Sequence, residues 1–312
     1  MPKFSSFFRL EPYRRFLTRT TRRFVLAPRW NLRGAAFYPP GHFYSPLLDI
    51  ASADGKSSHF PYDGAEYWEH VSLRSDDQRQ YYEQLLEFST LLPFPTHEEP
   101  RCRYFSDNDY FPVADAFALS AIIQKEKPRR IVEVGSGFSS AVILDTLERV
   151  TADVDRPQLT FIEPFPERLH SLMREVDSRM SRLLIQPVQE VALTVFEELS
   201  ANDILFIDSS HVAKVGSDVT FLILRVLPCL QPGVIVHFHD IVYPFSYPAE
   251  WLREGRAWNE SLFLRVFLLF NNVFEVIAFN SYAVQVFPEL FRNRVPEMLE
   301  NGGGSLWLRK VR

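Results

Sequence analysis

The sequence has only two cysteines, Cys102 and Cys229, among its 312 residues. They match no metal-ligand or redox spacing, so a disulfide framework is excluded and a reducing compartment is expected. No apolar run approaches the ~20 residues that span a bilayer, because the longest candidates are interrupted by Arg225 and Arg265. The charged region, apolar core and cleavage pattern of a secretory signal are missing as well. These absences predict a cytoplasmic protein without a transmembrane segment.

Acidic residues are scarce at the start of the chain. Residues 1–33 carry nine Lys/Arg and one acid, Glu11, giving +8, so the rest of a chain of net charge −5 carries −13. Scattered aromatic residues accompany these cations, which favours a cap that docks on the acidic main domain. Peripheral membrane contact by this basic arm is the alternative. We expect no nucleic-acid partner, and an oligomer stays open.

The hydrophobic pattern changes near residue 105, and we expect an N-terminal arm and cap at 1–104 and a main domain at 105–312. Short apolar runs alternate with helical patterns there, which is typical of a parallel sheet covered on both faces. The predicted fold class is α/β: a Rossmann-like, seven-stranded, mostly parallel sheet with helices on both faces, plus an N-terminal aromatic and basic cap region. Expected strands are 130–134, 159–162, 182–186, 204–207, 234–236, about 273–279 and 305–310; expected helices are 75–93, 112–126, 139–150, 166–179, 190–200 and 217–230.

A glycine-containing turn follows the first expected strand, in Glu133-Val134-Gly135-Ser136-Gly137-Phe138-Ser139-Ser140. Open α/β sheets bind ligands where a strand passes into a helix. Gly135 and Gly137 would let the backbone approach a ligand closely. Ser139 or Ser140 is expected to cap the next helix, whose positive end suits a carboxylate. A tight structural turn is the alternative interpretation.

Carboxylates and histidines are predicted at the ends of the following strands. Glu163 ends the second strand, where it could accept the two hydroxyls of a ribose. Asp208 and His211 follow the fourth strand, and His237, His239 and Asp240 end the fifth. Two neighbouring strand ends would thus present two aspartates and up to three histidines, which could hold a divalent cation. A surface glutamate and satisfied polar residues are the alternatives.

These residues resemble the class I S-adenosylmethionine-dependent methyltransferases. Residues 133–137 look like their glycine-rich motif, and Glu163 matches their ribose-binding acid. Residues 203–211 and 237–240 look like the metal-dependent macrocin-type O-methyltransferases and cephalosporin-hydroxylase-like proteins. The resemblance covers roughly residues 105–280. One departure is His239, which stands where those relatives often carry a second acid.

The resemblance implies S-adenosylmethionine as cofactor, a small-molecule acceptor and a divalent cation, magnesium or manganese. His211 would be the general base, assisted by Asp208, with Glu133 near the methionine amino group. The expected cofactor residues are Glu133, Gly135, Ser136, Gly137, Phe138, Ser139, Ser140, Glu163, Gln189, Asp208 and Ser209. The expected metal ligands are Asp208, His239 and Asp240. The expected acceptor residues are His42, Tyr44, Tyr110, Tyr243, Trp258 and Asn259.

Three other functions stay open at this point. An NAD-linked oxidoreductase would use a similar sheet, but Ser140 stands at the third glycine of G-x-G-x-x-G. A metal-dependent hydroxylase is suggested by the hydroxylase-like resemblance. A non-catalytic ligand-binding protein would keep the fold but not the activity. The presence of Glu133, Glu163, Asp208 and His211 argues against such a loss of catalysis. We therefore expect methyl transfer, with a hydroxyl as the most plausible acceptor.

Overall fold

The computed structural model describes residues 42, 44–45, 70–89, 94–150 and 156–312. The described residues fall into two compact parts, one with residues 42, 44–45 and 252–257 and the other with residues 70–89, 94–150, 156–251 and 258–312. In the first part, the rings of His42 and Tyr44 stack with centroids 6.0 Å apart. The predicted basic arm lies outside the described residues, so the cap and the boundary at residue 104 stay predictions.

The second part is built around one seven-stranded sheet with the order β3-β2-β1-β4-β5-β7-β6. All neighbouring pairs from β3 to β5 are parallel, and β7 is antiparallel to both β5 and β6. The predicted α/β fold with a mostly parallel sheet is confirmed. The strands are β1 (Arg130–Val134), β2 (Gln158–Ile162), β3 (Ser181–Leu184), β4 (Ile204–Ile207), β5 (Ile235–Phe238), β6 (Phe274–Phe279) and β7 (Leu306–Lys310).

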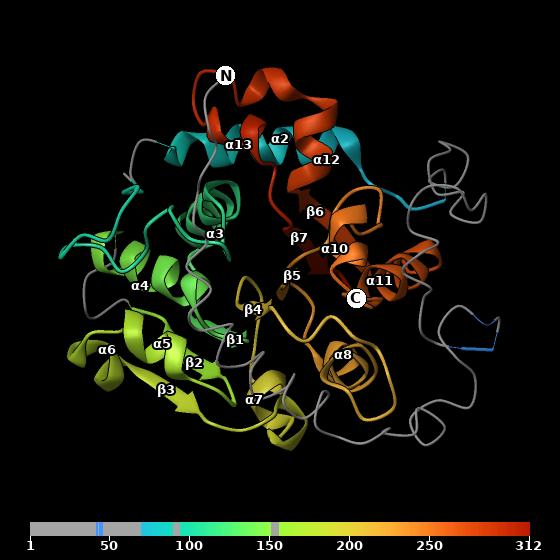
Figure 1. The fold of residues 1–312 in the computed structure, drawn as a ribbon, viewed down its shortest axis with the longest axis horizontal. Coiled ribbons are helices and arrows are strands. Elements are labelled where there is room, and N and C mark those ends of the chain that lie inside the picture. Colours follow the sequence, from blue (N-terminus) through green and yellow to red (C-terminus); the bar gives the residue numbers. More distant parts are fainter. Residues whose placement is uncertain (1–41, 43, 46–69, 90–93, 151–155) are drawn as a thin grey trace. The chain divides into compact units, whose positions relative to one another are not determined.

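Helices cover both faces of this sheet, with α3, α4 and α5 on one side and α7, α8 and α11 on the other (Figure 1). The helix α2 packs against β6. No helix in the described part of the chain is long and apolar enough to cross a membrane. The helices are α2 (Ser75–Leu85), α3 (Val113–Glu126), α4 (Phe138–Val150), α5 (Glu167–Leu172), α6 (Glu175–Met180), α7 (Thr194–Glu197), α8 (Asp218–Phe221), α9 (Leu227–Cys229), α10 (Ala249–Arg253), α11 (Glu260–Leu269), α12 (Asn280–Val286) and α13 (Glu297–Glu300).

The expected helix 190–200 is reduced to α7, and two other expected helices are interrupted for local reasons. The segment 166–179 forms α5 and α6, because Arg174 takes an extended conformation and its backbone N–H donates to the side chain of Asp177. The segment 217–230 contains a π-helical stretch, Leu222–Val226, between α8 and α9. Pro228 follows it and has no amide hydrogen for a regular helical bond. Neither change alters the order of the strands.

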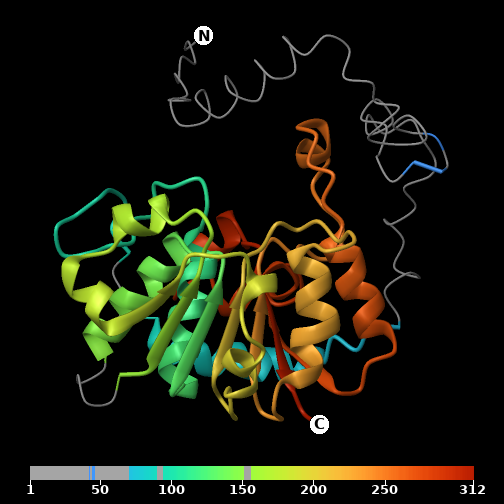
Figure 2. The ribbon, with the colours of Figure 1, turned by 90° about the horizontal axis from the view of Figure 1, so that it is seen from below.

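The register of the central strands places the candidate residues at one edge. Val134 of β1 pairs with Ile162 of β2 and Ile207 of β4, and Ile207 pairs with Phe238 of β5. All four side chains are buried, which fixes this register through the apolar pattern. The residues that follow these four ends therefore meet at the carboxyl edge of the sheet, which is the upper edge in Figure 2.

Candidate active site

The glycine turn after β1 is pressed against the chain that leaves β4. Gly135 has a φ of 82°, and a Cβ at this position would lie 1.7 Å from the carbonyl oxygen of Asp208. Its N–H donates to the carbonyl of Ile162 at 3.0 Å. Glycine is therefore required for both the backbone conformation and the close approach. The predicted turn is present, and only a residue without a side chain fits its first position.

Glu133 lies beneath this turn and is fully buried. Its carboxylate accepts a hydrogen bond from Ser139 Oγ at 2.6 Å and another from Ser140 Oγ. Ser140 Oγ in turn accepts from the N–H of Gly137 at 3.0 Å. Burial raises the pKa of Glu133 to about 8, although the serine hydroxyls oppose this. The helix α4 already begins at Phe138, so the two serines lock the turn to Glu133, and the expectation that they cap the helix is wrong.

Glu163 stands at the end of β2 and points its carboxylate at two backbone amides. Its oxygens accept from the N–H of Ser136 at 3.0 Å and from the N–H of Phe165 at 2.8 Å. Each oxygen keeps a second lone pair for a ligand hydroxyl. Glu163 lies on the wall of a cavity of about 180 Å³, together with Tyr110, Phe111, Gly135, Ser136, Gly137, Phe138, Ser139, Arg168, Asp208 and Ser209. We call this space the smaller cavity.

His211 is buried beside three carboxylates. Its Nδ1 lies 2.8 Å from Oε2 of Glu260, and its Nε2 lies 3.4 Å from Oδ1 of Asp208 and 3.5 Å from Oδ2 of Asp240. Burial alone lowers the pKa of His211, but Asp208 and Glu260 raise it well above its ordinary value. These carboxylates therefore favour the protonated imidazole, whose Nδ1 faces Glu260 and whose Nε2 faces Asp208 and Asp240.

The histidines of β5 have different surroundings. The ring of His237 is stacked 3.8 Å from that of Phe206, and its Nε2 contacts Ser305 Oγ at 2.9 Å. Burial lowers the pKa of His237 well below its ordinary value, so it is a neutral core residue and not a member of the site. His239 Nε2 lies 3.8 Å from Oδ1 of Asp240, and the pKa of His239 is raised because Asp208 and Asp240 outweigh the opposing effect of burial.

No group of three or more His, Cys, Asp or Glu residues in the described part of the chain is arranged to hold a metal ion. The three predicted ligands are nevertheless neighbours, since Asp208 and Asp240 both approach His211 and His239 approaches Asp240. In this arrangement the carboxylates of Asp208 and Asp240 both face Nε2 of His211.

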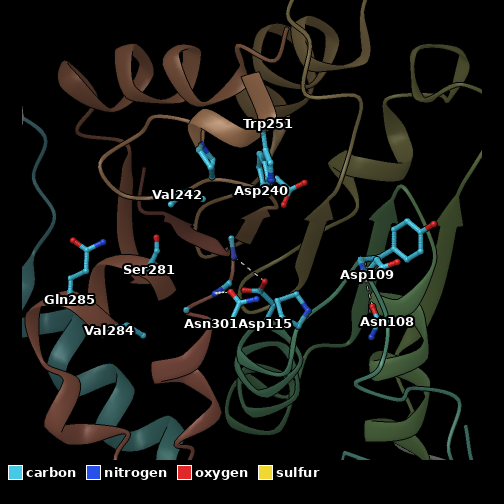
Figure 3. Close-up of a pocket in the computed structure, with 16 residues that line it drawn as sticks. Asn108, Asp109, Asp115, Asp240, Val242, Trp251, Ser281, Val284, Gln285 and Asn301 are labelled. Carbon is cyan, nitrogen blue, oxygen red and sulfur yellow. Dashed lines mark hydrogen bonds between the residues drawn. The ribbon is translucent and has the colours of Figure 1, made fainter. Parts of the chain in front are cut away.

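A larger cavity of about 490 Å³ adjoins these residues (Figure 3). Asp240 lies on its wall, and Tyr110 lines both cavities. We call this space the larger cavity. Its other lining residues come from the loop before α3, the segment after β5, α10, α12 and the loop before β7: Asn108, Asp109, Pro112, Asp115, Val242, Pro248, Trp251, Ser281, Val284, Gln285, Asn301, Gly302, Gly303 and Gly304.

The remaining predicted residues lie in several places. Trp258 has its ring 4.5 Å from that of His211. Asn259 fixes the loop after His211, because its side chain accepts from the N–H of Ala213 at 2.6 Å. Tyr243 packs on Phe279 and Tyr282, while Gln189 donates to the carbonyl of Gly216 at 3.0 Å. His42 and Tyr44 belong to the other compact part.

Three residues of the site were not predicted from the sequence. Glu260 lies 49 residues beyond its partner His211 and follows no motif. Arg168 places its guanidinium 3.6 Å from the centre of the Tyr110 ring and lines the smaller cavity. Asp115 accepts from the N–H of Gly304 at 2.9 Å and fixes the loop before β7. The run Gly302-Gly303-Gly304 was the one available signal, since a Cβ on Gly304 would lie 2.9 Å from Cα of Asp240.

Comparisons with known proteins give a domain assignment. Residues 132–241 match a family model described as a methyltransferase domain. An uncharacterized protein of Archaeoglobus fulgidus is 33% identical over 169 residues, which cover 53% of this chain and 75% of that protein.

Solved structures show weaker likeness. A methyltransferase of Podospora anserina bound to SAH is 13% identical, with 76% of this chain and 88% of that chain covered and a TM-score of 0.42. The O-methyltransferase TomG of Streptomyces achromogenes, in complex with SAM, is 17% identical, with 76% and 89% covered and a TM-score of 0.39. Likeness at this level carries no argument about a ligand.

Proposed function

We propose that this chain, which belongs to the same family as the archaeal protein and whose residues 132–241 match a methyltransferase domain, transfers a methyl group from S-adenosylmethionine to a hydroxyl group of a small molecule. One observation carries the proposal. Asp208 lines the smaller cavity and Asp240 lines the larger one, and His211 Nε2 lies 3.4 and 3.5 Å from their carboxylates. His211 therefore lies between one carboxylate that lines the smaller cavity and another that lines the larger cavity.

The smaller cavity presents the groups that we expect to bind the cofactor. Glu163 is placed to accept the ribose hydroxyls, and the backbone of residues 135–139 forms a wall that the methionine tail can follow. Glu133 lies below this wall and favours a positive charge above it once its carboxyl group ionises. When bound, the cofactor supplies an activated methyl group on a sulfonium centre. The closeness of Gly135 to Asp208 holds the two strand ends at a fixed separation.

His211 is the proposed base. A hydroxyl group that enters from the larger cavity would give its proton to Nε2 of a neutral His211, and the carboxylate of Glu260 would stabilise the imidazolium through Nδ1. The transfer of the proton from oxygen to nitrogen lets the oxygen attack the methyl carbon. Asp208 and Asp240 hold the imidazole between them and also favour the charged ring. Glu260, His211 and the acceptor hydroxyl group would thus be arranged as the carboxylate, histidine and hydroxyl of a catalytic triad are.

Positioning supplies most of the expected acceleration. Holding two reactants in attacking geometry is worth about 7–11 kcal/mol. A positioned base adds about 10²- to 10⁴-fold, or roughly 3–5 kcal/mol. An alcohol with a pKa near ~15.7 is a weak acid, and the raised pKa of His211 narrows the gap to it. The same raised pKa reduces the fraction of His211 that is neutral at a given pH. His211 is thus a stronger base that is less often in its basic form.

Asp208 and Asp240 would hold a divalent cation, with His239 beside them, if one takes part. Carboxylate oxygens are ligands that magnesium and manganese prefer. A bound cation would assist ionisation of the hydroxyl group. It would also compete with the proton of His211, because both are held by the same two carboxylates.

Calorimetric titration with S-adenosylhomocysteine and with NADH tests the proposed cofactor. We expect S-adenosylhomocysteine alone to bind, with release of up to about one proton from Glu133 at pH 7. The reason is that Glu133, with a pKa of about 8, is neutral in the free protein, and the amino group of the ligand favours its ionised form. Heats measured in phosphate and in Tris buffer give the number of protons released.

Two comparisons sharpen this titration. The variant Glu133→Gln should bind without the proton release, and the release should vanish above pH 9 in the unaltered protein. Binding of NADH in place of S-adenosylhomocysteine would instead support an oxidoreductase.

The turnover rate is expected to increase as the pH is raised from 6 upward. The neutral form of His211 is the base, and its pKa lies well above 6.5, so the active fraction grows as the pH passes through that raised value. Magnesium should move the rising limb to lower pH, because a cation at Asp208 and Asp240 disfavours the imidazolium. Initial rates from pH 6 to 10, with EDTA or with magnesium, measure both effects. Identical profiles would show that catalysis uses the protein groups without a cation.

A further inference from the structure

The larger cavity has an unusual balance of charge. Its ionisable lining residues are Asp109, Asp115, Asp240 and Tyr110, and no Lys, Arg or His lines it within the described part of the chain. The nearby cation Arg168 lines the smaller cavity and lies against the Tyr110 ring. The larger cavity is therefore an acidic compartment, and its volume of about 490 Å³ is within the usual range for small-molecule sites.

The three aspartates differ in how far their carboxylate oxygens are already engaged by other residues. Asp115 is fully buried, and its oxygens accept from the side chain of Asn280 and from the N–H groups of Gly304 and Ser305 at 2.9–3.0 Å. Asp240 shares its carboxylate with His211. Asp109 is exposed and makes no hydrogen bond or ion pair with the other described residues. Asp109 is thus the carboxylate available to pair with a charged group (Figure 3).

An aromatic wall accompanies these acids. Trp251 lines the larger cavity, and its ring packs 5.3 Å from that of Trp258, which in turn lies 4.5 Å from His211. Tyr110 also lines this cavity, but Arg168 and Phe138 already lie against its ring. Indole faces attract organic cations, and they also contact the C–H surfaces of ring compounds. The wall therefore reaches from the acidic lining to the proposed base.

We propose that the acceptor is a hydroxyl-bearing amine, such as an amino sugar or an amino alcohol, and that the larger cavity selects it by charge. This inference rests on the proposed function. The ammonium group pairs with Asp109 and the aromatic wall, while a hydroxyl group faces Asp240 and His211. Phosphorylated or carboxylated acceptors are disfavoured, because Asp109 would repel a second anion and no Lys, Arg or His lines the cavity within the described residues.

The reaction balances without any further reagent. The hydroxyl oxygen forms the new bond to the methyl carbon, and the bond from that carbon to sulfur breaks with its electron pair kept by sulfur. The hydroxyl proton goes to His211. The products are the methyl ether of the amine, S-adenosylhomocysteine and one proton. The ammonium group stays protonated, so it competes poorly with the hydroxyl group as a nucleophile.

Three matched pyranoses test the selection: glucosamine, glucose and glucuronate. Each is titrated into the protein with and without saturating S-adenosylhomocysteine, and tryptophan fluorescence, to which Trp251 of the cavity wall contributes, reports binding. We expect glucosamine to bind about fivefold to thirtyfold more tightly than glucose, and glucuronate more weakly than both. The advantage of glucosamine should shrink as NaCl is raised.

The variant Asp109→Asn should weaken glucosamine binding about twofold to fivefold and leave glucose binding unchanged. Asp107→Asn is the matched control, since Asp107 lies in the same loop but not in the cavity lining. Equal binding of glucosamine and glucose, or an equal effect of Asp109→Asn on both, would overturn the proposal.

Failure of the charge selection is separable from failure of the proposed function. Loss of S-adenosylhomocysteine binding refutes the proposed cofactor, while the sugar titrations still measure selection by charge. Binding of S-adenosylhomocysteine with a preference for glucuronate refutes the acceptor class alone.

Discussion

Replacing His211 by alanine is expected to lower turnover by about 10²- to 10⁴-fold, the usual contribution of a positioned base. Affinity for S-adenosylhomocysteine should change by less than threefold, since His211 does not line the smaller cavity. The remaining rate would come from positioning of the two ligands. Single-turnover rates and calorimetric affinities give the two quantities. Turnover equal to that of the unaltered protein would refute the base assignment.

A second variant separates the loss of a base from the loss of structure. Removing His211 leaves the buried carboxylate of Glu260 without its partner, which can destabilise the fold. Glu260→Gln keeps the imidazole and removes the charge behind it. The pKa of His211 should then fall, so the rising limb of the pH profile moves to lower pH while the maximal rate decreases. An unchanged limb would mean that Glu260 has only a structural role.

Replacing Gly135 by alanine is expected to abolish measurable cofactor binding. A left-handed conformation costs a residue with a side chain about 1–2 kcal/mol. The larger effect is steric, because the new Cβ would lie 1.7 Å from the carbonyl oxygen of Asp208 and the two strand ends would have to separate. This separation would displace Glu163 and Asp208 relative to each other. Calorimetry with S-adenosylhomocysteine and a thermal melt measure binding and stability.

Gly216 provides the control for backbone strain. Its φ is 78°, close to that of Gly135, but no atom lies within 4 Å of the position that a Cβ would take. Gly216→Ala should therefore cost only the conformational penalty and leave cofactor binding nearly intact. Equal losses of binding in the two variants would show that the contact with Asp208 is unimportant.

The sheet was predictable because its central strands are buried on both faces. Runs such as Ile204–Ile207 are continuously apolar, and a sharp change to polar residues marks each strand end. Because β1, β2 and β4 are parallel neighbours, the glycine turn after β1 and the acids after β2 and β4 must lie at the same edge of the sheet. The approach of Asp208 and Asp240 to one imidazole was also predictable, because β4 and β5 are neighbours.

The rest of the site depends on packing at long range. Glu260 reaches His211 only because α11 begins beside the loop that Asn259 fixes, and no local pattern marks that meeting. The role of His237 depends on which face of β5 is covered by Trp307, a residue of the last strand. Alternation along one strand cannot tell whether a histidine near the strand end turns to the core or to the ligand.

Tyr110 lines both cavities. An occupant of one cavity that displaces this side chain would alter the space in the other. Affinity for the methyl donor and affinity for the acceptor are then linked, and thermodynamic reciprocity requires each to change the other by the same factor. Measuring either ligand in isolation would therefore describe a state of the enzyme that differs from the one in which transfer occurs.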